Sequence, residues 1–485
     1  MCSYKDMLPL STTRDFAMRQ PHVLVLPFPA QGHIKPMLCL AELLCQAGLR
    51  VTFLNTHHSH RRLNNLQDLS TRFPTLHFES VSDGLPEDHP RNLVHFMHLV
   101  HSIKNVTKPL LRDLLTSLSL KTDIPPVSCI IADGILSFAI DVAEELQIKV
   151  IIFRTISSCC LWSYLCVPKL IQQGELQFSD SDMGQKVSSV PEMKGSLRLH
   201  DRPYSFGLKQ LEDPNFQFFV SETQAMTRAS AVIFNTFDSL EAPVLSQMIP
   251  LLPKVYTIGP LHALRKARLG DLSQHSSFNG NLREADHNCI TWLDSQPLRS
   301  VVYVSFGSHV VLTSEELLEF WHGLVNSGKR FLWVLRPDII AGEKDHNQII
   351  AREPDLGTKE KGLLVDWAPQ EEVLAHPSVG GFLTHCGWNS TLESMVAGVP
   401  MLCWPKLPDQ LVNSSCVSEV WKIGLDLKDM CDRSTVEKMV RALMEDRREE
   451  VMRSVDGISK LARESVSHGG SSSSNLEMLI QELET

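Results

Sequence analysis

Short apolar runs alternate with amphipathic stretches along the first half of the chain. The run PHVLVLPFP predicts a buried strand, HIKPMLCLAELLCQAG has the spacing of a helix that ends at Gly48, and LRVTFLNT predicts a second strand. A strand, a helix and a strand within about thirty residues predict a right-handed βαβ unit and therefore a parallel sheet. The same pattern predicts further strands at LHFESV, VSCIIAD, KVIIF and AVIFNTF.

The alternation stops between residues 262 and 286, where the chain becomes polar and irregular, and this change predicts an interdomain linker. Strands are predicted again at SVVYVSFGS, RFLWVLR, GLLVDWA and GGFLTHCGWNS, with a helix at SEELLEFWHGLVNSG. We therefore expect an α/β protein with two doubly wound domains. Their ligands should bind in a cleft at the carboxyl ends of the strands.

These elements divide the 485 residues into five parts. The tail holds four serines at 471–474, which predict a short flexible link before a helical segment, NLEMLIQELET, that can pack back on the N-terminal domain. The expected parts are a disordered leader at 1–19, an N-terminal domain at 20–261, the linker at 262–286, a C-terminal domain at 287–460 and a C-terminal tail helix at 461–485.

The nine residues HCGWNSTLE, from His385 to Glu393, lie at the junction between a predicted strand and a predicted helix. The first amides of a helix lack intrahelical partners and the helix dipole adds positive charge there, so such a turn can bind an anion, typically a phosphate. Asn389 and Ser390 would add donors, and Glu393 would accept bonds from sugar hydroxyls one turn further on. From these residues alone, an ordinary N-cap with a capping glutamate is the alternative.

Composition and charge exclude several classes of protein. A net charge of −10 argues against a nucleic-acid partner, which calls for a basic surface. No run approaches the ~18 uncharged apolar residues of a membrane span, and the start of the chain lacks the apolar core of a signal peptide. The twelve cysteines form no CxxC pair, which suits reduced thiols, and we expect a cytoplasmic protein.

Other motifs carry less weight. GLVNSGKR resembles a phosphate-binding loop, but it follows a helix and precedes a strand, the reverse of the required order. The absence of GxGxxG argues against a nicotinamide or flavin enzyme. His57, His58 and His60 lack a cysteine or carboxylate at ligand spacing, so no metal site is predicted. For Cys386 a structural thiol is favoured over a nucleophile.

A longer segment carries a family resemblance. From Trp367 to Gln410, the 44 residues WAPQEEVLAHPSVGGFLTHCGWNSTLESMVAGVPMLCWPKLPDQ resemble the signature box of the plant secondary-product UDP-glycosyltransferases. PFPAQGH, NTF, YTIGP and SFGS extend the resemblance along the chain. It implies the GT-B fold, in which two Rossmann-like domains face each other, one binding the acceptor and the other the UDP-sugar. It also implies inverting transfer without a metal ion or other cofactor, and we expect a monomer.

The resemblance implies that a set of residues binds the donor. Trp367 would stack on the uracil with its flat apolar face, and Glu393 would hold the ribose hydroxyls. Asp409 and Gln410 would bind the sugar, and the glutamine resembles members that use glucose. Leu407–Pro408 departs from the usual aromatic and small residues, which leaves the shape of the sugar pocket open. The other members, including those that contact the diphosphate, are Ser308, Ala368, Gln370, His385, Trp388, Asn389 and Ser390.

The resemblance also implies a catalytic pair in the N-terminal domain. His33 lies at a strand–helix junction in QGHIKP, where the positive helix end favours a neutral imidazole that can accept a proton. Asp133 ends another predicted strand, IIAD, and would fix the tautomer of the imidazole and stabilise its charged form. The alternatives are a capping histidine and a capping aspartate.

These expectations predict a UDP-glucose-dependent O-glucosyltransferase that transfers glucose with inversion to a hydroxyl or carboxyl of a small apolar metabolite. The segments FESVSDGLPEDHP and KVYTIGPLHAL most resemble the branch that acts on iridoid, terpenoid or triterpenoid aglycones. A flavonoid or phenolic acceptor, or a non-catalytic nucleotide-sugar-binding protein, is the alternative. An oxidoreductase is disfavoured.

Overall fold

The structure is a computed structural model that describes residues 20–63, 66–91, 95–173, 190–193, 213–270, 283–340, 361–427 and 430–485. The predicted disordered leader at 1–19 lies outside these residues, as do parts of the predicted linker. Within the described ranges, no helix is both long enough and apolar enough to cross a membrane.

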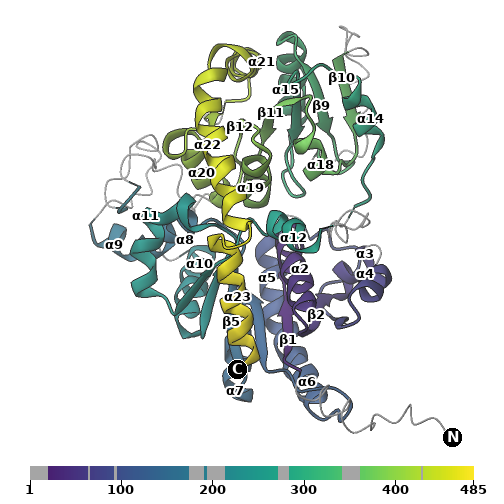
Figure 1. The fold of residues 1–485 in the computed structure, drawn as a ribbon, viewed down its shortest axis with the longest axis vertical. Helices are drawn as coiled ribbons and strands as arrows, with labels where there is room; N and C mark the ends of the chain where they lie inside the picture. Colours follow the sequence, from purple (N-terminus) through teal and green to yellow (C-terminus); the bar gives the residue numbers. More distant parts are fainter. Residues whose placement is uncertain are drawn as a thin grey trace, which may run out of the picture.

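The first half of the chain forms a parallel sheet of seven strands in the order β3-β2-β1-β4-β5-β6-β7 (Figure 1). Strand β1 pairs on one side with β2 and on the other with β4, so the strand order reverses between β1 and β4. The strands are β1 (His22–Leu26), β2 (Arg50–Thr56), β3 (Leu76–Val81), β4 (Cys129–Asp133), β5 (Lys149–Arg154), β6 (Ala231–Phe234) and β7 (Lys254–Thr257).

The second half forms a parallel sheet of six strands in the order β10-β9-β8-β11-β12-β13. Here the order reverses between β8 and β11. The strands are β8 (Val301–Ser305), β9 (Arg330–Val334), β10 (Gly362–Val365), β11 (Val379–Thr384), β12 (Met401–Cys403) and β13 (Gly424–Asp426). The prediction of two doubly wound, Rossmann-like domains is therefore confirmed, although β7, β12 and β13 were not predicted as strands.

Helices cover both sheets. In the N-terminal half they are α2 (Gln31–Gln46), α3 (His57–Arg62), α4 (Leu66–Arg72), α5 (Phe96–Ser102), α6 (Lys108–Ser119), α7 (Phe138–Leu146), α8 (Ser158–Leu165), α9 (Val167–Gln172), α10 (Pro214–Ala225), α11 (Asp238–Met248) and α12 (Leu261–Leu269). In the C-terminal half they are α14 (Asn288–Asp294), α15 (Ser314–Asn326), α18 (Gln370–Ala375), α19 (Trp388–Ala397), α20 (Pro408–Ser415), α21 (Arg433–Arg441), α22 (Arg448–Val466) and α23 (Ser471–Glu484). Short π-helical turns are η2 (Ile103–Thr107), η6 (Cys416–Val420) and η7 (Ala442–Asp446), and short 3-10 turns are η4 (Met226–Arg228) and η5 (Ile249–Leu251).

The apolar side chains of β1 show why the N-terminal sheet is covered on both faces. Because successive side chains of a strand point to opposite faces, Leu24 and Leu26 belong to one buried apolar cluster, whereas Val23 and Val25 belong to another. The first cluster continues into the C-terminal domain, where it includes residues of β8 and β11. Apolar packing therefore continues from one domain to the other.

The predicted linker does not begin as irregular chain. Its first residues form α12, which packs against α2 with Leu261, Leu264 and Leu269 buried. The charged residue Arg265 is also buried, and its Nε donates to Glu42 Oε2 at 2.7 Å. The segment was predicted to be irregular because it is rich in charged residues. It nevertheless forms a helix, since the charge of Arg265 is neutralised by Glu42, which is distant in the sequence.

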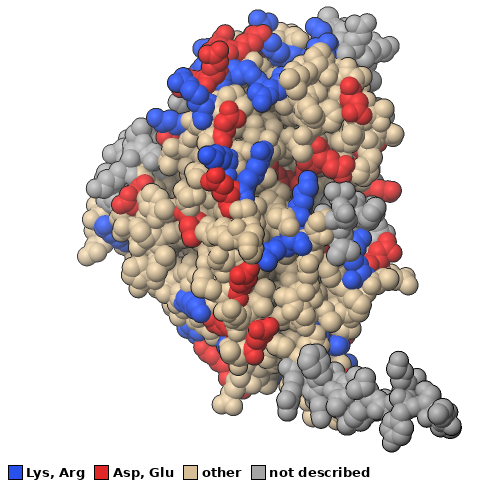
Figure 2. Space-filling view, viewed as in Figure 1, with Lys and Arg blue, Asp and Glu red and all other residues tan. Residues whose placement is uncertain are grey.

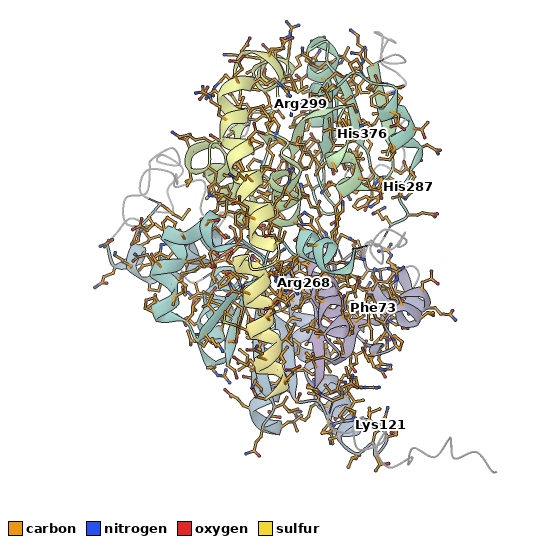
Figure 3. All side chains as sticks on the ribbon, viewed as in Figure 1. Phe73, Lys121, Arg268, His287, Arg299 and His376 are labelled. Carbon is orange, nitrogen blue, oxygen red and sulfur yellow. The ribbon has the colours of Figure 1, made fainter. Side chains whose placement is uncertain are left out.

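The C-terminal tail also differs from its prediction. Helix α22 continues through the expected boundary at 460 and ends at Val466. The four serines form the first turn of α23 rather than a flexible link, and Ser472 and Ser473 are buried. Helix α23, at the yellow end of the chain in Figure 1, packs along β7 of the N-terminal sheet. Arg268 at the end of α12, labelled in Figure 3, donates to Glu477 Oε1 of α23 at 2.6 Å.

On the face drawn in Figure 2, lysine and arginine side chains are interspersed with aspartate and glutamate over both domains. No single basic patch covers this face among the described residues.

Candidate functional site

The carboxyl ends of the two sheets enclose a cavity of about 270 Å³ between the domains. His33 lines it from the N-terminal side, while Asp133 lies behind His33 with its side chain only 1% exposed. The structure therefore brings the predicted catalytic and donor-binding residues to one place. The predicted donor-binding residues that line the cavity are Ser308, Trp367, Ala368, Gln370, His385, Trp388, Asn389, Ser390, Glu393, Asp409 and Gln410.

The histidine and aspartate come from two neighbouring strand ends. His33 is in the first turn of α2, which follows β1, and Asp133 is the last residue of β4. The distance between His33 Nδ1 and Asp133 Oδ2 is 2.7 Å, and the hydroxyl of Thr155 lies 3.1 Å from the same nitrogen. The other carboxylate oxygen accepts from the amide of Ile135 at 3.2 Å. Among the described residues none bonds His33 Nε2, so this nitrogen is available to a ligand.

The turn between β11 and α19 lacks an ordinary cap. Its N-cap, Gly387, offers no side chain, and Thr391 is the first residue whose amide donates back to the Gly387 carbonyl, at 3.0 Å. The carboxylate of Glu393 does not cap the turn, because it accepts bonds from other side chains. The alternative of an N-cap with a capping glutamate is therefore not observed. The first amides of α19 keep the unsatisfied donors that suit an anion.

His385 is held between two glycines. A Cβ atom on Gly307 or on Gly387 would lie 2.4 or 2.5 Å from His385 Nε2, so only glycine allows the backbone to approach the ring this closely. Burial lowers the pKa of His385 to about 3. The ring is therefore neutral at pH 7, and its Nδ1 has no hydrogen-bond partner in the described part of the chain.

A charged cluster that the sequence did not predict joins the two domains. Lys35 of α2 donates to Glu371 Oε1 at 2.6 Å and to Glu393 Oε1 at 2.7 Å. Gln370 Nε2 donates to the other oxygen of Glu393 at 2.6 Å and to the hydroxyl of Ser390 at 2.8 Å. Burial alone would lower the pKa of Lys35, but the charges of the two glutamates outweigh it and raise the pKa. Lys35 lies two residues after His33 in the sequence. The neighbouring sequence, however, does not indicate which carboxylates its side chain contacts.

The predicted sugar-binding positions lie at the start of α20. Gln410 Oε1 accepts from the amides of Lys406 and Leu407 at 3.0 Å each, which leaves its NH₂ group as the part that can reach a ligand. Burial raises the pKa of Asp409 to about 6. Leu407 and Pro408, where the sequence departs from the family pattern, line the cavity beside them.

Some predicted donor-binding residues also hold the domains together. The indole N–H of Trp388 donates to the Asn235 carbonyl at 2.8 Å, and Asn389 Nδ2 donates to the Gly32 carbonyl at 2.8 Å. Asn235, in the motif NTF, also donates to Asn389 Oδ1 at 3.3 Å. The guanidinium carbon of Arg283 lies 6.0 Å from the centroid of the Trp367 ring. The positions of the two domains are therefore coupled to the geometry of the anion-binding turn.

Comparisons with known proteins agree with this geometry. A family model described as UDP-glucoronosyl and UDP-glucosyl transferase matches residues 65–460. The chain is 50% identical over 466 residues to 7-deoxyloganetic acid glucosyltransferase of Catharanthus roseus, covering 95% of this chain and 96% of that protein. It is 49% identical over 460 residues to mogroside I-A1 synthase of Siraitia grosvenorii, covering 94% and 87% of the two chains.

The fold matches a solved structure as well. Phytolacca americana UGT2, complexed with UDP-2fluoro-glucose and pterostilbene, superimposes with a TM-score of 0.76 at 26% identity, covering 96% of this chain and 100% of that chain. The family model and the two relatives each span most of the chain. The protein is thus an enzyme of the UDP-glucoronosyl and UDP-glucosyl transferase family.

Proposed function

We propose that the protein is a UDP-glucose-dependent O-glucosyltransferase that transfers glucose with inversion to a hydroxyl of a small terpenoid aglycone, of the iridoid or triterpenoid type. One observation carries this proposal. The hydrogen-bonded pair of His33 and the buried Asp133 and the uncapped start of α19 line or adjoin the same cavity from opposite domains. The relatives that act on 7-deoxyloganetic acid and form mogroside I-A1 support the terpenoid class.

In the proposed mechanism, His33 Nε2 accepts the proton of the acceptor hydroxyl. Asp133 accepts the hydrogen bond from Nδ1, which sets the tautomer and stabilises the imidazolium that forms. The acceptor oxygen attacks the anomeric carbon from the side opposite the diphosphate. The bond between that carbon and the diphosphate oxygen breaks, and UDP leaves with the electron pair, so one displacement inverts the configuration.

We infer that the leaving diphosphate binds at the start of α19. The free amides and the helix dipole stabilise the charge that develops on the leaving oxygen. They supply the positive potential that a divalent cation supplies in other transferases, so we propose that turnover needs no metal. Treatment with a chelator should leave the rate unchanged.

The donor can bind without breaking the charged cluster. A carboxylate accepts about four hydrogen bonds, whereas Glu393 accepts one from Lys35 and one from Gln370. Two acceptor positions therefore remain for the ribose hydroxyls, while Trp367 is available for stacking on the uracil. Glucose would bond Asp409 and the NH₂ group of Gln410.

The cysteines bear on the setting of the reaction. Eleven cysteines of the described residues are free thiols, and nearly all are buried. They support our proposal of a reducing, cytoplasmic compartment. We also propose that the enzyme acts as a monomer, which size-exclusion chromatography coupled to light scattering would test.

The test of the function is direct. The purified protein is incubated with UDP-glucose and, separately, with 7-deoxyloganetic acid, a triterpenoid alcohol and a flavonol, and the products are analysed by mass spectrometry. We expect the gain of one hexose on a terpenoid acceptor, and no gain with the His33→Ala variant. Binding of UDP-glucose without transfer to any acceptor would instead indicate a non-catalytic nucleotide-sugar-binding protein. A product on the flavonol alone would place the acceptor in the phenolic class.

A further inference from the structure

Three cations line the cavity, and two of them are neutralised by the protein itself. Lys35 is held between two carboxylates, as described above. Arg91 forms a two-pronged pair with Asp83, with Nε and Nη2 at 2.8 and 3.0 Å from its two oxygens. The third cation, Arg154, forms no ion pair with a carboxylate of any described residue. Among the described residues that line the cavity, Arg154 is therefore a cation whose charge no contact neutralises.

Arg154 is buried with a fixed side chain. It is the last residue of β5, and only 5% of its surface is exposed. Its Nη1 donates to the Gly134 carbonyl at 2.6 Å, while its Nε has no hydrogen-bond partner among the described residues. A Cβ atom on Gly134 would lie 2.3 Å from Arg154 Cδ, so the side chain crosses the backbone at a point where only glycine leaves room. The guanidinium is thus positioned before any ligand binds.

The two carboxylates whose charges act on Arg154 are hydrogen-bonded to other partners. Glu222 accepts from the amide and the hydroxyl of Ser137 at 2.8 and 2.7 Å, and Asp133 bonds His33. Burial lowers the pKa of Arg154, and the distant charges of Asp133 and Glu222 offset this effect only in part. A buried cation without a contacting anion costs stability unless a ligand supplies the anion.

The N-terminal wall of the cavity, to which Arg154 belongs, is largely apolar. The apolar residues that line the N-terminal side of the cavity are Phe28, Phe96, Leu99, Ile135, Ile156 and Phe219. A planar guanidinium in such a wall suits a carboxylate, because its fixed donors match the two oxygens. An apolar molecule with one carboxylate would pack against these apolar side chains and at the same time neutralise the guanidinium.

We propose that Arg154 binds a carboxylate of the acceptor, so that the preferred acceptor is a terpenoid hydroxy acid. This inference rests on the proposed glucosyltransferase function and names the acceptor's charged group. The hydroxyl faces His33 Nε2 and receives the glucose, while the carboxylate lies on Arg154. A carboxylate is already ionised at pH 7, so it offers His33 no proton, and its pairing with Arg154 keeps it from attacking the donor.

The experiment uses two matched acceptor pairs: 7-deoxyloganetic acid and a triterpenoid hydroxy acid, each with its methyl ester. Initial rates are measured at saturating UDP-glucose with the full-length enzyme. We expect the wild type to prefer each acid over its ester by at least about tenfold in kcat/KM, since a hydrogen bond to a charged group is worth roughly 1.5–3 kcal/mol. The acid products should be O-glucosides rather than glucose esters, which mild alkali distinguishes.

The variant Arg154→Gln should lower kcat/KM for the acids by about 10- to 100-fold, mainly through KM. It should change the esters by less than about threefold and leave UDP affinity unchanged. Arg154→Lys should keep part of the preference for the acids, because it retains the charge but not the planar fork. Ile156→Val is the matched control, because it trims the same wall without changing charge, and it should affect acid and ester alike.

Each result decides between stated possibilities. Equal losses for acids and esters in Arg154→Gln would assign Arg154 a structural role and overturn the inference. Equal wild-type rates on acids and esters, or a glucose ester as product, would also overturn it, and these wild-type measurements need no stable variant. In both cases the glucosyltransferase function would stand. Failure to transfer glucose to any of the four acceptors would instead count against the proposed function.

Discussion

The two sheets place different chemistry at the same topological positions. In each, the strand order reverses between the first strand and the fourth, β1 and β4 in one and β8 and β11 in the other. His33 follows β1 and Asp133 ends β4, and these two side chains bond each other. After β8 and β11 come turns that each contain one glycine, Gly307 and Gly387, and the second turn leads into the uncapped start of α19. The fold therefore fixes where ligands meet the protein, and the residues after the strands decide what happens there.

The two sites also differ in the number of groups on which each depends. The proposed N-terminal site depends on one imidazole, so a single substitution should remove its activity. The C-terminal site combines backbone amides with several side chains, so any single substitution should remove only part of the binding. We therefore expect a single substitution to cause a larger loss in the N-terminal site than in the C-terminal site.

The largest effect is expected for His33→Ala. A general base contributes about 10²–10⁴-fold when a hydroxyl must lose its proton, so kcat for hydroxyl acceptors should fall by that factor. Asp133→Ala should lose less, because it acts through His33. UDP affinity, measured by calorimetry, should stay at the wild-type value in both variants. A parallel loss of UDP affinity would show that the two sites are not separate.

A smaller effect is expected at the donor site. Trp367→Ala and Glu393→Ala should each weaken UDP binding by roughly 1–3 kcal/mol, or about 5- to 150-fold, through lost stacking or lost hydrogen bonds to the ribose. Titration calorimetry with UDP measures this directly. Unchanged UDP affinity in both variants would remove the proposed roles of the two residues.

The cluster that joins the two sites predicts a pH-dependent stability. Burial alone would raise the pKa of Glu371, but Lys35 outweighs it and lowers this pKa from 4.5 to about 2. A lowered carboxyl pKa stabilises the fold above pH 4.5, and this stability is lost as the pH falls toward 2. Lys35→Met should therefore reduce the free energy of unfolding by about 1–3 kcal/mol at pH 7.

Denaturant titrations at several pH values test this prediction. The difference between wild type and Lys35→Met should be largest above pH 5 and should shrink as the pH falls from 4.5 toward 2. A difference that does not depend on pH would mean that lost packing, rather than the ion pair, accounts for the change.

The smallest effect concerns the sugar. The carbonyl of Gln410 is occupied by backbone amides, so only its NH₂ group can bond a sugar hydroxyl. One neutral hydrogen bond is worth about 0.5–1.5 kcal/mol, so UDP-glucose should be preferred over UDP-galactose by about 2- to 10-fold in kcat/KM. Competition between the two donors, followed by product analysis, measures the ratio. Equal use of both would mean that neither Gln410 nor Asp409 distinguishes the sugars.

Local patterns predicted the long strands and the site positions that belong to a continuous motif. They did not predict β12 and β13, because three residues are too few to show a period of two. They also missed α12, where the burial of Arg265 depends on Glu42.

The site residues divide in the same way. All the predicted donor residues line the cavity, but Lys35 meets Glu393 across 358 positions of sequence. Arg154 is distinctive because no carboxylate of the described residues contacts it, and no local pattern can show such an absence. Some residues have a role that depends on whether a residue distant in the sequence contacts them. Such a role can be inferred only from the structure.

The course of α23 has a consequence for dividing the protein. Leu476, Leu479 and Leu483 belong to the apolar cluster formed by β1, β2 and α2, and the C terminus lies at the base of the N-terminal domain (Figure 1). The N-terminal domain is therefore a discontinuous unit, assembled from the first and last segments of the sequence. A fragment cut at residue 270 would expose the apolar side chains that α23 covers, whereas the C-terminal sheet is formed by one unbroken stretch of chain.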